Sequence, residues 1–181
     1  NEEVDYLGAN ISFGSQSAWL SSLSKYFPRV LELMADAAQN PIFTQEEFDK
    51  EANLLKDGIK SGENSVQNIA NRVQNLLAYG KNHPYGEYTS IATVDNVTLA
   101  DVQTFYATYF KPNNAYLVIV GDVDFKEVKK LVTKNFSKWQ QGVVPSYDIP
   151  ATVNVSATEI DFINMPNAVQ SEIVVANNID L

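Results

Sequence analysis

The hydrophobic pattern of residues 99–139 predicts a helix, a strand and a second helix. Apolar residues recur at spacings of three and four in 99–109, which is typical of an amphipathic helix, and Pro112 ends it. Residues 115–120 are apolar without alternation and rich in β-branched types, so they predict a strand that is covered on both faces. Helical spacing returns in residues 125–132. A buried strand between two one-sided helices indicates a two-layer α/β or α+β domain.

Upstream of this segment, the pattern predicts a pair of strands and then three helices. Alternating apolar and polar residues favour strands at 9–13 and 18–24. Spacings of three and four favour helices after them, and Thr44 with Glu47 forms a capping-box sequence. The signals that bound the three helices are Pro28 and Asn40, Thr44 and Gly62, and Ser65 and Gly80. The stretch that follows Gly80 is expected to be a turn and a loop up to Val97.

Composition divides the chain near residues 140–152, which contain glycine and prolines but no periodicity and therefore predict a linker. Residues 1–139 are expected to form one α+β domain. Residues 153–181 are expected to begin the following subdomain, with strands at 153–163 and 168–176. The chain starts with what resembles the end of a helix capped by Gly8, so we expect it to be a piece of a longer protein.

Charge and composition exclude several classes of function. The 181 residues contain 13 basic and 22 acidic side chains, and the formal net charge is −9. A basic face for phosphate contacts is therefore not expected, which argues against a nucleic-acid partner. The sequence has no cysteine, so disulfides, thiolate metal sites and cysteine nucleophiles are excluded. No run is long or apolar enough to predict a membrane span, and no signal peptide is visible.

A catalytic apparatus is hard to assemble from the residues alone. His83 is the only histidine, so a catalytic triad or a multi-histidine zinc site cannot be built within the chain. It lies in the turn His83-Pro84-Tyr85-Gly86, where we expect it to make a local hydrogen bond. The carboxylates early in the helix after Thr44 complement the helix dipole. Gly121-Asp122 lacks the further glycines of a phosphate-binding loop and predicts a turn and a helix cap.

Several phrases, in order, resemble the pitrilysin and mitochondrial processing peptidase family of zinc metallopeptidases. They cover nearly the whole chain, and together they are specific although each is weak alone. The matching phrases are residues 40–48 (NPIFTQEEF), 79–86 (YGKNHPYG), 97–115, 117–122 (LVIVGD) and 165–171. The resemblance implies an α+β fold of two layers, with helices packed on one face of a largely antiparallel sheet.

The same resemblance bears on zinc. The family binds zinc through an inverted H-x-x-E-H motif and a glutamate on a later helix. This chain has no H-x-x-E-H, and the family pattern places it before residue 1. The later helix corresponds to the one from Thr44, where Glu51 matches a supporting glutamate and the ligand position, seven residues later, is Gly58. Asp57 is one residue away, turned by about 100° on a helix, and becomes the ligand only if the register shifts by one.

The resemblance therefore implies a non-catalytic domain with no catalytic residue and no metal ligand of its own. Its expected role is to form half of a peptide-enclosing chamber beside a zinc-bearing half of the same protein or a partner subunit. The start of the chain, Gly8-Ala9-Asn10-Ile11-Ser12, also resembles the non-catalytic members. The alternatives are the later part of an active zinc endopeptidase, with Asp57 as third ligand, and a binding domain without peptidase context. Bacterial relatives suggest the cell envelope.

Overall fold

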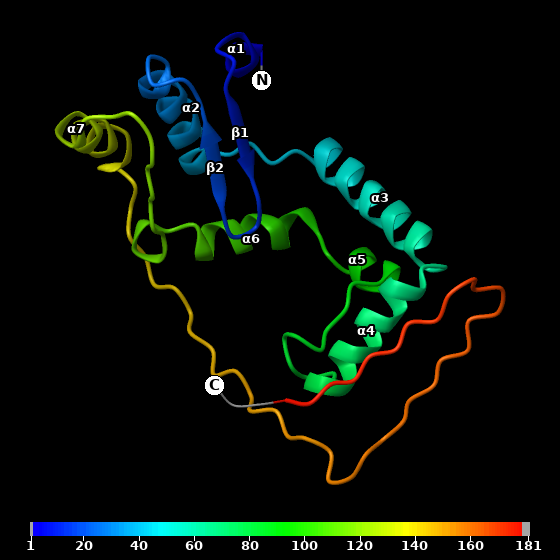
Figure 1. The fold of residues 1–181 in the computed structure, drawn as a ribbon. Helices are drawn as coiled ribbons and strands as arrows, with labels where there is room; N and C mark the ends of the chain where they lie inside the picture. The colour runs from blue at the N-terminus through cyan, green and yellow to red at the C-terminus, as the bar shows by residue number, and fades with distance from the viewer. Residues whose placement is uncertain (1, 179–181) are drawn as a thin grey trace. The chain divides into compact units, whose positions relative to one another are not determined.

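The computed structural model describes residues 2–178, and the chain forms two compact units (Figure 1). The first unit comprises the residues up to Phe43 and residues 100–145. The second comprises residues 44–99 and the residues from Ser146 onward. Each unit is thus assembled from two separate stretches of the chain. The domain boundaries expected from composition, at residues 139 and 152, remain a prediction.

The first unit combines a two-stranded antiparallel hairpin with helices. Ile11 pairs with Leu20 and Ser12 pairs with Trp19, so the apolar partners Ile11 and Leu20 share one face of the hairpin. Gly8, at φ +60°, follows the first helix and acts as its C-cap, as predicted. The elements are α1 (Glu2–Tyr6), β1 (Asn10–Phe13), β2 (Ala18–Ser21), α2 (Phe27–Gln39), α6 (Leu99–Tyr109), the 3-10 turn η1 (Pro112–Asn114) and α7 (Phe125–Phe136).

Helix α2 forms the core of the first unit. It packs against β2 and α7, and it supplies most of the buried hydrophobic side chains: Val30, Leu31, Met34, Ala35 and Ala38. Two side chains fasten its C-terminal end. The Gln39 amide donates to the carbonyl of Asn135 in α7 (2.9 Å), and the Tyr106 hydroxyl of α6 donates to the carbonyl of Ala38 (2.7 Å). These bonds satisfy carbonyl groups near a helix end and join three helices.

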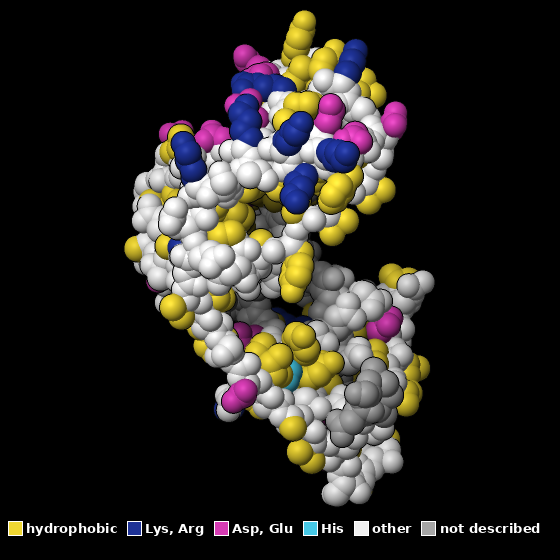
Figure 2. Space-filling view, turned by 90° about the vertical axis from the view of Figure 1, so that its left-hand side faces the viewer, with side chains coloured by type: hydrophobic (Ala, Val, Ile, Leu, Met, Phe, Trp, Pro, Cys, Tyr) yellow, Lys and Arg dark blue, Asp and Glu magenta, His cyan; other side chains and the backbone are white. Residues whose placement is uncertain are grey.

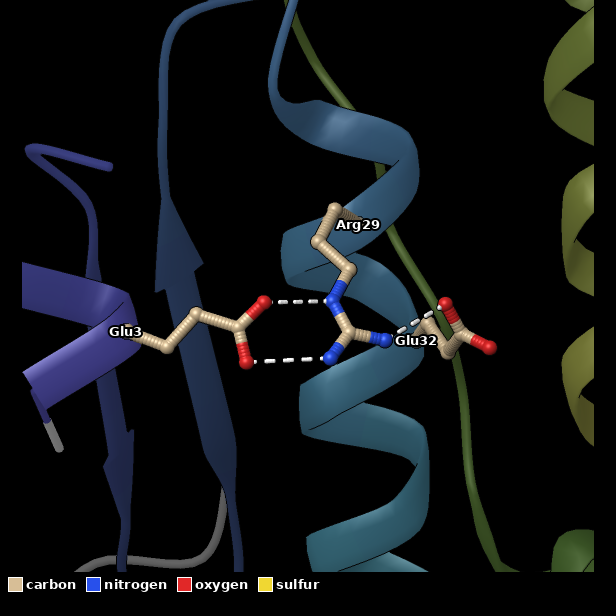
Figure 3. A network of polar contacts seen from close by, with 3 residues as sticks. All are labelled: Glu3, Arg29 and Glu32. Carbon is tan, nitrogen blue, oxygen red and sulfur yellow. Dashed lines mark hydrogen bonds and ion pairs between the residues drawn. The ribbon is translucent and has the colours of Figure 1, made fainter. Parts of the chain in front are cut away.

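Arg29 holds α1 against α2 (Figure 3). Its Nε and Nη2 donate to the two carboxylate oxygens of Glu3 at 2.6 and 2.9 Å, and its Nη1 donates to Glu32 at 2.9 Å. The bonds from Arg29 hold the pKa of the Glu3 carboxyl below its usual value and raise the pKa of the guanidinium. The pair is half-exposed, so it orients α1 more than it stabilises the fold.

The second unit consists of helices with capped N-termini and long extended stretches. Its helices are α3 (Gln45–Gly62), α4 (Val66–Tyr79) and α5 (Ile91–Asp95). The hydroxyls of Thr44 and Ser65 accept the N–H groups of Glu47 and Asn68, as the sequence predicted. The prediction of a loop up to Val97 is wrong in part. Ser90 and Thr93 form a reciprocal capping box that starts the short helix α5.

Two contacts tie the second unit together. Lys56 of α3 forms an ion pair with Asp95 of α5. Residues 172–178 are bonded to both ends of α4: the Gln67 amide donates to Glu172 (3.3 Å), and the Asn178 amide donates to the carbonyl of Ala78 (2.6 Å). The last stretch of the second unit is therefore fastened along α4.

Three predicted strands are wrong in the structure. Residues 115–120, 153–163 and 168–176 do not form hydrogen-bonded strands within the part of the chain that is described. A strand exists only where a neighbour supplies backbone partners, and only β1 and β2 pair in residues 2–178. The α+β class is confirmed, with a smaller sheet than expected. Within the same residues, no helix combines the length and apolar character needed to cross a membrane.

Candidate functional site

Helix α3 presents the position at which the resemblance places a metal ligand. Gly58 lies in the last third of this 18-residue helix and is exposed, and its backbone has no left-handed strain. A Cβ built at Gly58 meets no atom within 4 Å. The position therefore offers room for a side chain but carries no donor atom. Nothing in the local packing requires glycine there.

Glu51 and Asp57 are the carboxylates beside this position. Both are exposed on α3, and Glu51 lies seven residues before Gly58, which places the two on one face of the helix. Asp57 projects about 100° away from that face. Among residues 2–178, no group of three or more His, Asp or Glu side chains is placed to hold a metal ion. The assignment of Gly58 to the empty ligand position remains a prediction.

A cluster of aromatic rings lies at the C-terminal end of α4. The rings of Tyr79 and His83 are stacked, with centroids 5.0 Å apart, and Tyr85 contacts both at 5.4 and 5.3 Å. His83 is only 5% exposed, whereas both tyrosines reach the surface. Figure 2 shows the imidazole (cyan) almost covered by hydrophobic side chains. We call Tyr79, His83 and Tyr85 the aromatic cluster.

The backbone of the turn explains why the cluster has this shape. Gly80, at φ +80°, ends α4, and its carbonyl accepts the N–H of His83 (3.2 Å). The N–H of Tyr85 donates to Nδ1 of His83 (3.0 Å), so the proton of the neutral ring is on Nε2. A Cβ at Gly86 would lie 1.9 Å from the carbonyl oxygen of Gly80, so only glycine fits. The predicted turn and the local bond of His83 are confirmed.

Arg72 extends the surface of α4 beyond the aromatic cluster. Its guanidinium lies over the ring of Tyr88, 4.6 Å from the centroid. Arg72 precedes Tyr79 by seven residues, so both side chains project from one face of the helix. We did not single out Arg72 in the sequence, although the spacing of seven between a basic and an aromatic residue was a visible signal. The arrangement offers a guanidinium and phenol hydroxyls as hydrogen-bond donors at the surface.

The comparisons with known proteins found one family model and several relatives. Residues 96–179 match the family model of the peptidase M16 inactive domain. Subunit 1 of the mitochondrial cytochrome b-c1 complex of Bos taurus is 22% identical over 86% of this chain. The probable zinc protease PqqL of Escherichia coli is 28% identical over 61% of this chain. The chain spans only 32% and 12% of these two relatives.

Solved structures share the fold. A peptidase M16 inactive domain from Pseudomonas fluorescens matches with a TM-score of 0.73 and 22% identity, over 84% of this chain and 38% of that one. The first half of the periplasmic protease PqqL from E. coli matches with a TM-score of 0.63 and 22% identity, over 82% of this chain and 35% of that one.

The fold is that of a peptidase-like domain. The match of residues 96–179 to the peptidase M16 inactive domain, together with relatives that are named zinc proteases, supports a non-catalytic, peptidase-like domain of the pitrilysin type. The resemblance drawn from the sequence is thereby confirmed. The matched relatives include proteins that are named zinc proteases.

Proposed function

We propose that this domain forms part of the non-catalytic half of a peptide-enclosing chamber, opposite a zinc-bearing half of the same protein or a partner subunit. The observation that carries the proposal is Gly58. At the position where the resemblance places a zinc ligand, Gly58 has no carboxylate to offer, and the local packing does not require a glycine there. The first half of PqqL, which shares this fold, comes from a two-half periplasmic protease, and this supports the same division of labour here.

The face of α4 that carries Arg72 and the aromatic cluster is our candidate for contact with the peptide. Tyr79 and Tyr85 are partly exposed, and each offers a flat ring and a hydroxyl. Peptide carbonyls accept hydrogen bonds from such donors, and a guanidinium adds charge-assisted bonds. Because His83 is buried and bonded through Nδ1, its role in this proposal is to hold the two tyrosine rings in place.

The zinc in this proposal lies outside residues 1–181. Zinc would be bound by two imidazoles and a carboxylate of the other half, where it would activate a water molecule for peptide hydrolysis. This domain would bind and orient the peptide from the opposite wall. We place the protein in the bacterial cell envelope, as supported by the periplasmic location of PqqL.

Steady-state peptide cleavage by the longer protein tests the proposal. Arg72→Ala and Tyr79→Phe should raise KM several-fold, because they remove donors to the peptide, and they should leave the zinc content unchanged. Asp57→Asn should alter neither zinc nor cleavage. It is the matched control, because it removes a charged group from an exposed helix surface outside the α4 face.

Two results would contradict the proposal. Loss of both zinc and cleavage in Asp57→Asn would show that Asp57 is the third ligand and that the chain belongs to an active endopeptidase domain. Unchanged KM for Arg72→Ala and for Tyr79→Phe would show that the α4 face does not contact the peptide. The zinc measurement separates the two failures.

A further inference from the structure

Helix α7 carries a face of lysines in an otherwise acidic chain. Residues 125–138 contain five lysines and one acidic residue, Glu127, so their formal charge is +4. The whole chain has a net charge of −9, so the rest of it carries −13. The net charge of the whole chain, from which no basic face was expected, conceals this separation. We call the exposed lysines of this stretch the lysine face: Lys126, Lys129, Lys130, Lys134 and Lys138.

The helical period places the lysine face on one side of α7. At about 100° per residue, its four members within the helix fall inside a sector of about 140°. The other residues of this sector, Thr133 and Ser137, carry no charge. Figure 2 shows Lys and Arg side chains (dark blue) gathered on this side of the first unit, with a few acidic side chains among them.

The opposite side of α7 belongs to the core of the first unit. Its apolar side chains are partly buried: Val128, Leu131, Val132 and Phe136. Helix α7 packs against α2, and the bond from the Gln39 amide to the carbonyl of Asn135 fixes its orientation. The lysine face therefore points away from the core.

The described part of the chain does not neutralise the lysine face. None of the ion pairs among residues 2–178 involves a lysine of α7, although Glu127 lies only three residues before Lys130. Lys130 is four residues from both Lys126 and Lys134, a spacing at which like charges repel on a helix. Lys126 also lies in the first turn, where the helix dipole disfavours a cation. The lysine face thus lowers the stability of α7, which favours a role in binding over a structural one.

We propose that the lysine face docks the protein on an anionic phospholipid surface. The proposal rests on the charge and exposure of α7 and does not depend on the proposed contact with a peptide. Each lysine of a helix that lies along such a surface adds to the affinity through its attraction to the lipid phosphates. Because the apolar side of α7 is turned to the core, the helix lies on the headgroups and does not insert into the bilayer.

Phe125 favours a lipid surface over other anionic partners. Its side chain is 77% exposed, and it precedes Lys129 by four residues, so the ring lies at the edge of the lysine face. An aromatic ring beside cations is typical of helices at a membrane interface, where the ring enters the boundary between headgroups and acyl chains. A flat surface also meets only one side of the protein, and salt screens the acidic residues on the far side over about 10 Å.

Co-sedimentation of the longer protein with phosphatidylglycerol vesicles tests the proposal, with phosphatidylcholine vesicles as the neutral reference. The protein should bind the anionic vesicles and not the neutral ones, and about 1 M salt should release it. The double variant Lys126→Gln with Lys130→Gln should bind about 25-fold more weakly, since each lysine near an anionic surface contributes about a fivefold factor. Phe125→Ser should weaken binding several-fold.

The double variant Lys60→Gln with Lys81→Gln is the matched control. It removes two exposed lysines from the second unit and should leave vesicle binding unchanged. Neither double variant should have a lower melting temperature than the wild type, because all four side chains are exposed.

Three results would overturn the proposal. The first is an absence of binding to phosphatidylglycerol vesicles, and the second is an equal loss of binding in the two double variants. The third is tighter binding to polyglutamate or to a DNA duplex than to the vesicles, which would assign the lysine face to an acidic protein or to a nucleic acid.

Discussion

Replacement of Gly58 by alanine should stabilise the chain. A glycine within a helix is about 0.8–1.0 kcal/mol less favourable than alanine, because its backbone is freer in the unfolded state. The full gain is expected here, because an added Cβ meets no atom within 4 Å and the backbone of Gly58 is helical. For a chain of this length, about 1 kcal/mol corresponds to a rise of about 2–4 °C in melting temperature.

Circular dichroism at 222 nm is the appropriate assay for Gly58→Ala. It reports the helix content of both units, including α3, whereas Trp19 and Trp139 both lie in the first unit and would report on that unit alone by fluorescence. Gly80→Ala is the matched control: Gly80 has φ +80°, so alanine there should destabilise by about 1 kcal/mol. A Gly58→Ala variant that is no more stable than the wild type would refute the argument that the position is free of packing constraints.

Four further outcomes are expected. Gly86→Ala should lower the free energy of unfolding in urea by about 3 kcal/mol, because the added Cβ would lie 1.9 Å from the carbonyl oxygen of Gly80. In a urea titration, His83→Ala should lower the free energy of unfolding by about 1–3 kcal/mol. His83→Asn should lower it less, since the asparagine oxygen can accept the same N–H. Tyr106→Phe should cost about 1 kcal/mol in thermal unfolding, because it leaves a helix carbonyl without its donor. The Glu3–Arg29 contact stabilises the docking of α1 on α2 at pH values above the usual Glu pKa of 4.5. This stabilisation should be lost as the pH falls through the lowered pKa of Glu3. Limited proteolysis of α1 at a series of pH values can follow the loss.

Local signals in the sequence were sufficient for the helices and their ends. Thr44, Ser65 and Asp124 cap their helices through side-chain hydrogen bonds to residues two or three positions later. These helix starts can therefore be predicted from residues that are close in sequence. Helix α5 was missed because five residues are too few to show a helical period. The bond of His83 was predictable for the same local reason.

The two strands of the hairpin, β1 and β2, were predicted, because their partners are close in sequence. The other predicted strands could not be judged from local signals, because a strand depends on a partner that can be distant in sequence. Residues 115–120 have the composition of a covered strand, yet within residues 2–178 nothing pairs with them. The candidate site shows the same limit. The interest of Gly58 came from the resemblance to a family pattern. The contact of Arg72 with the ring of Tyr88 could not be predicted from the sequence, because Tyr88 follows the turn that ends α4.

The zinc content of the purified chain tests the central conclusion, that this is a non-catalytic domain, most directly. After equilibrium dialysis against zinc, elemental analysis should find well below one zinc per chain, and Gly58→Glu alone should not change this, since one glutamate supplies one of the three protein ligands of a catalytic site. One tightly bound zinc per wild-type chain that disappears in Asp57→Asn would contradict the account and make Asp57 a metal ligand.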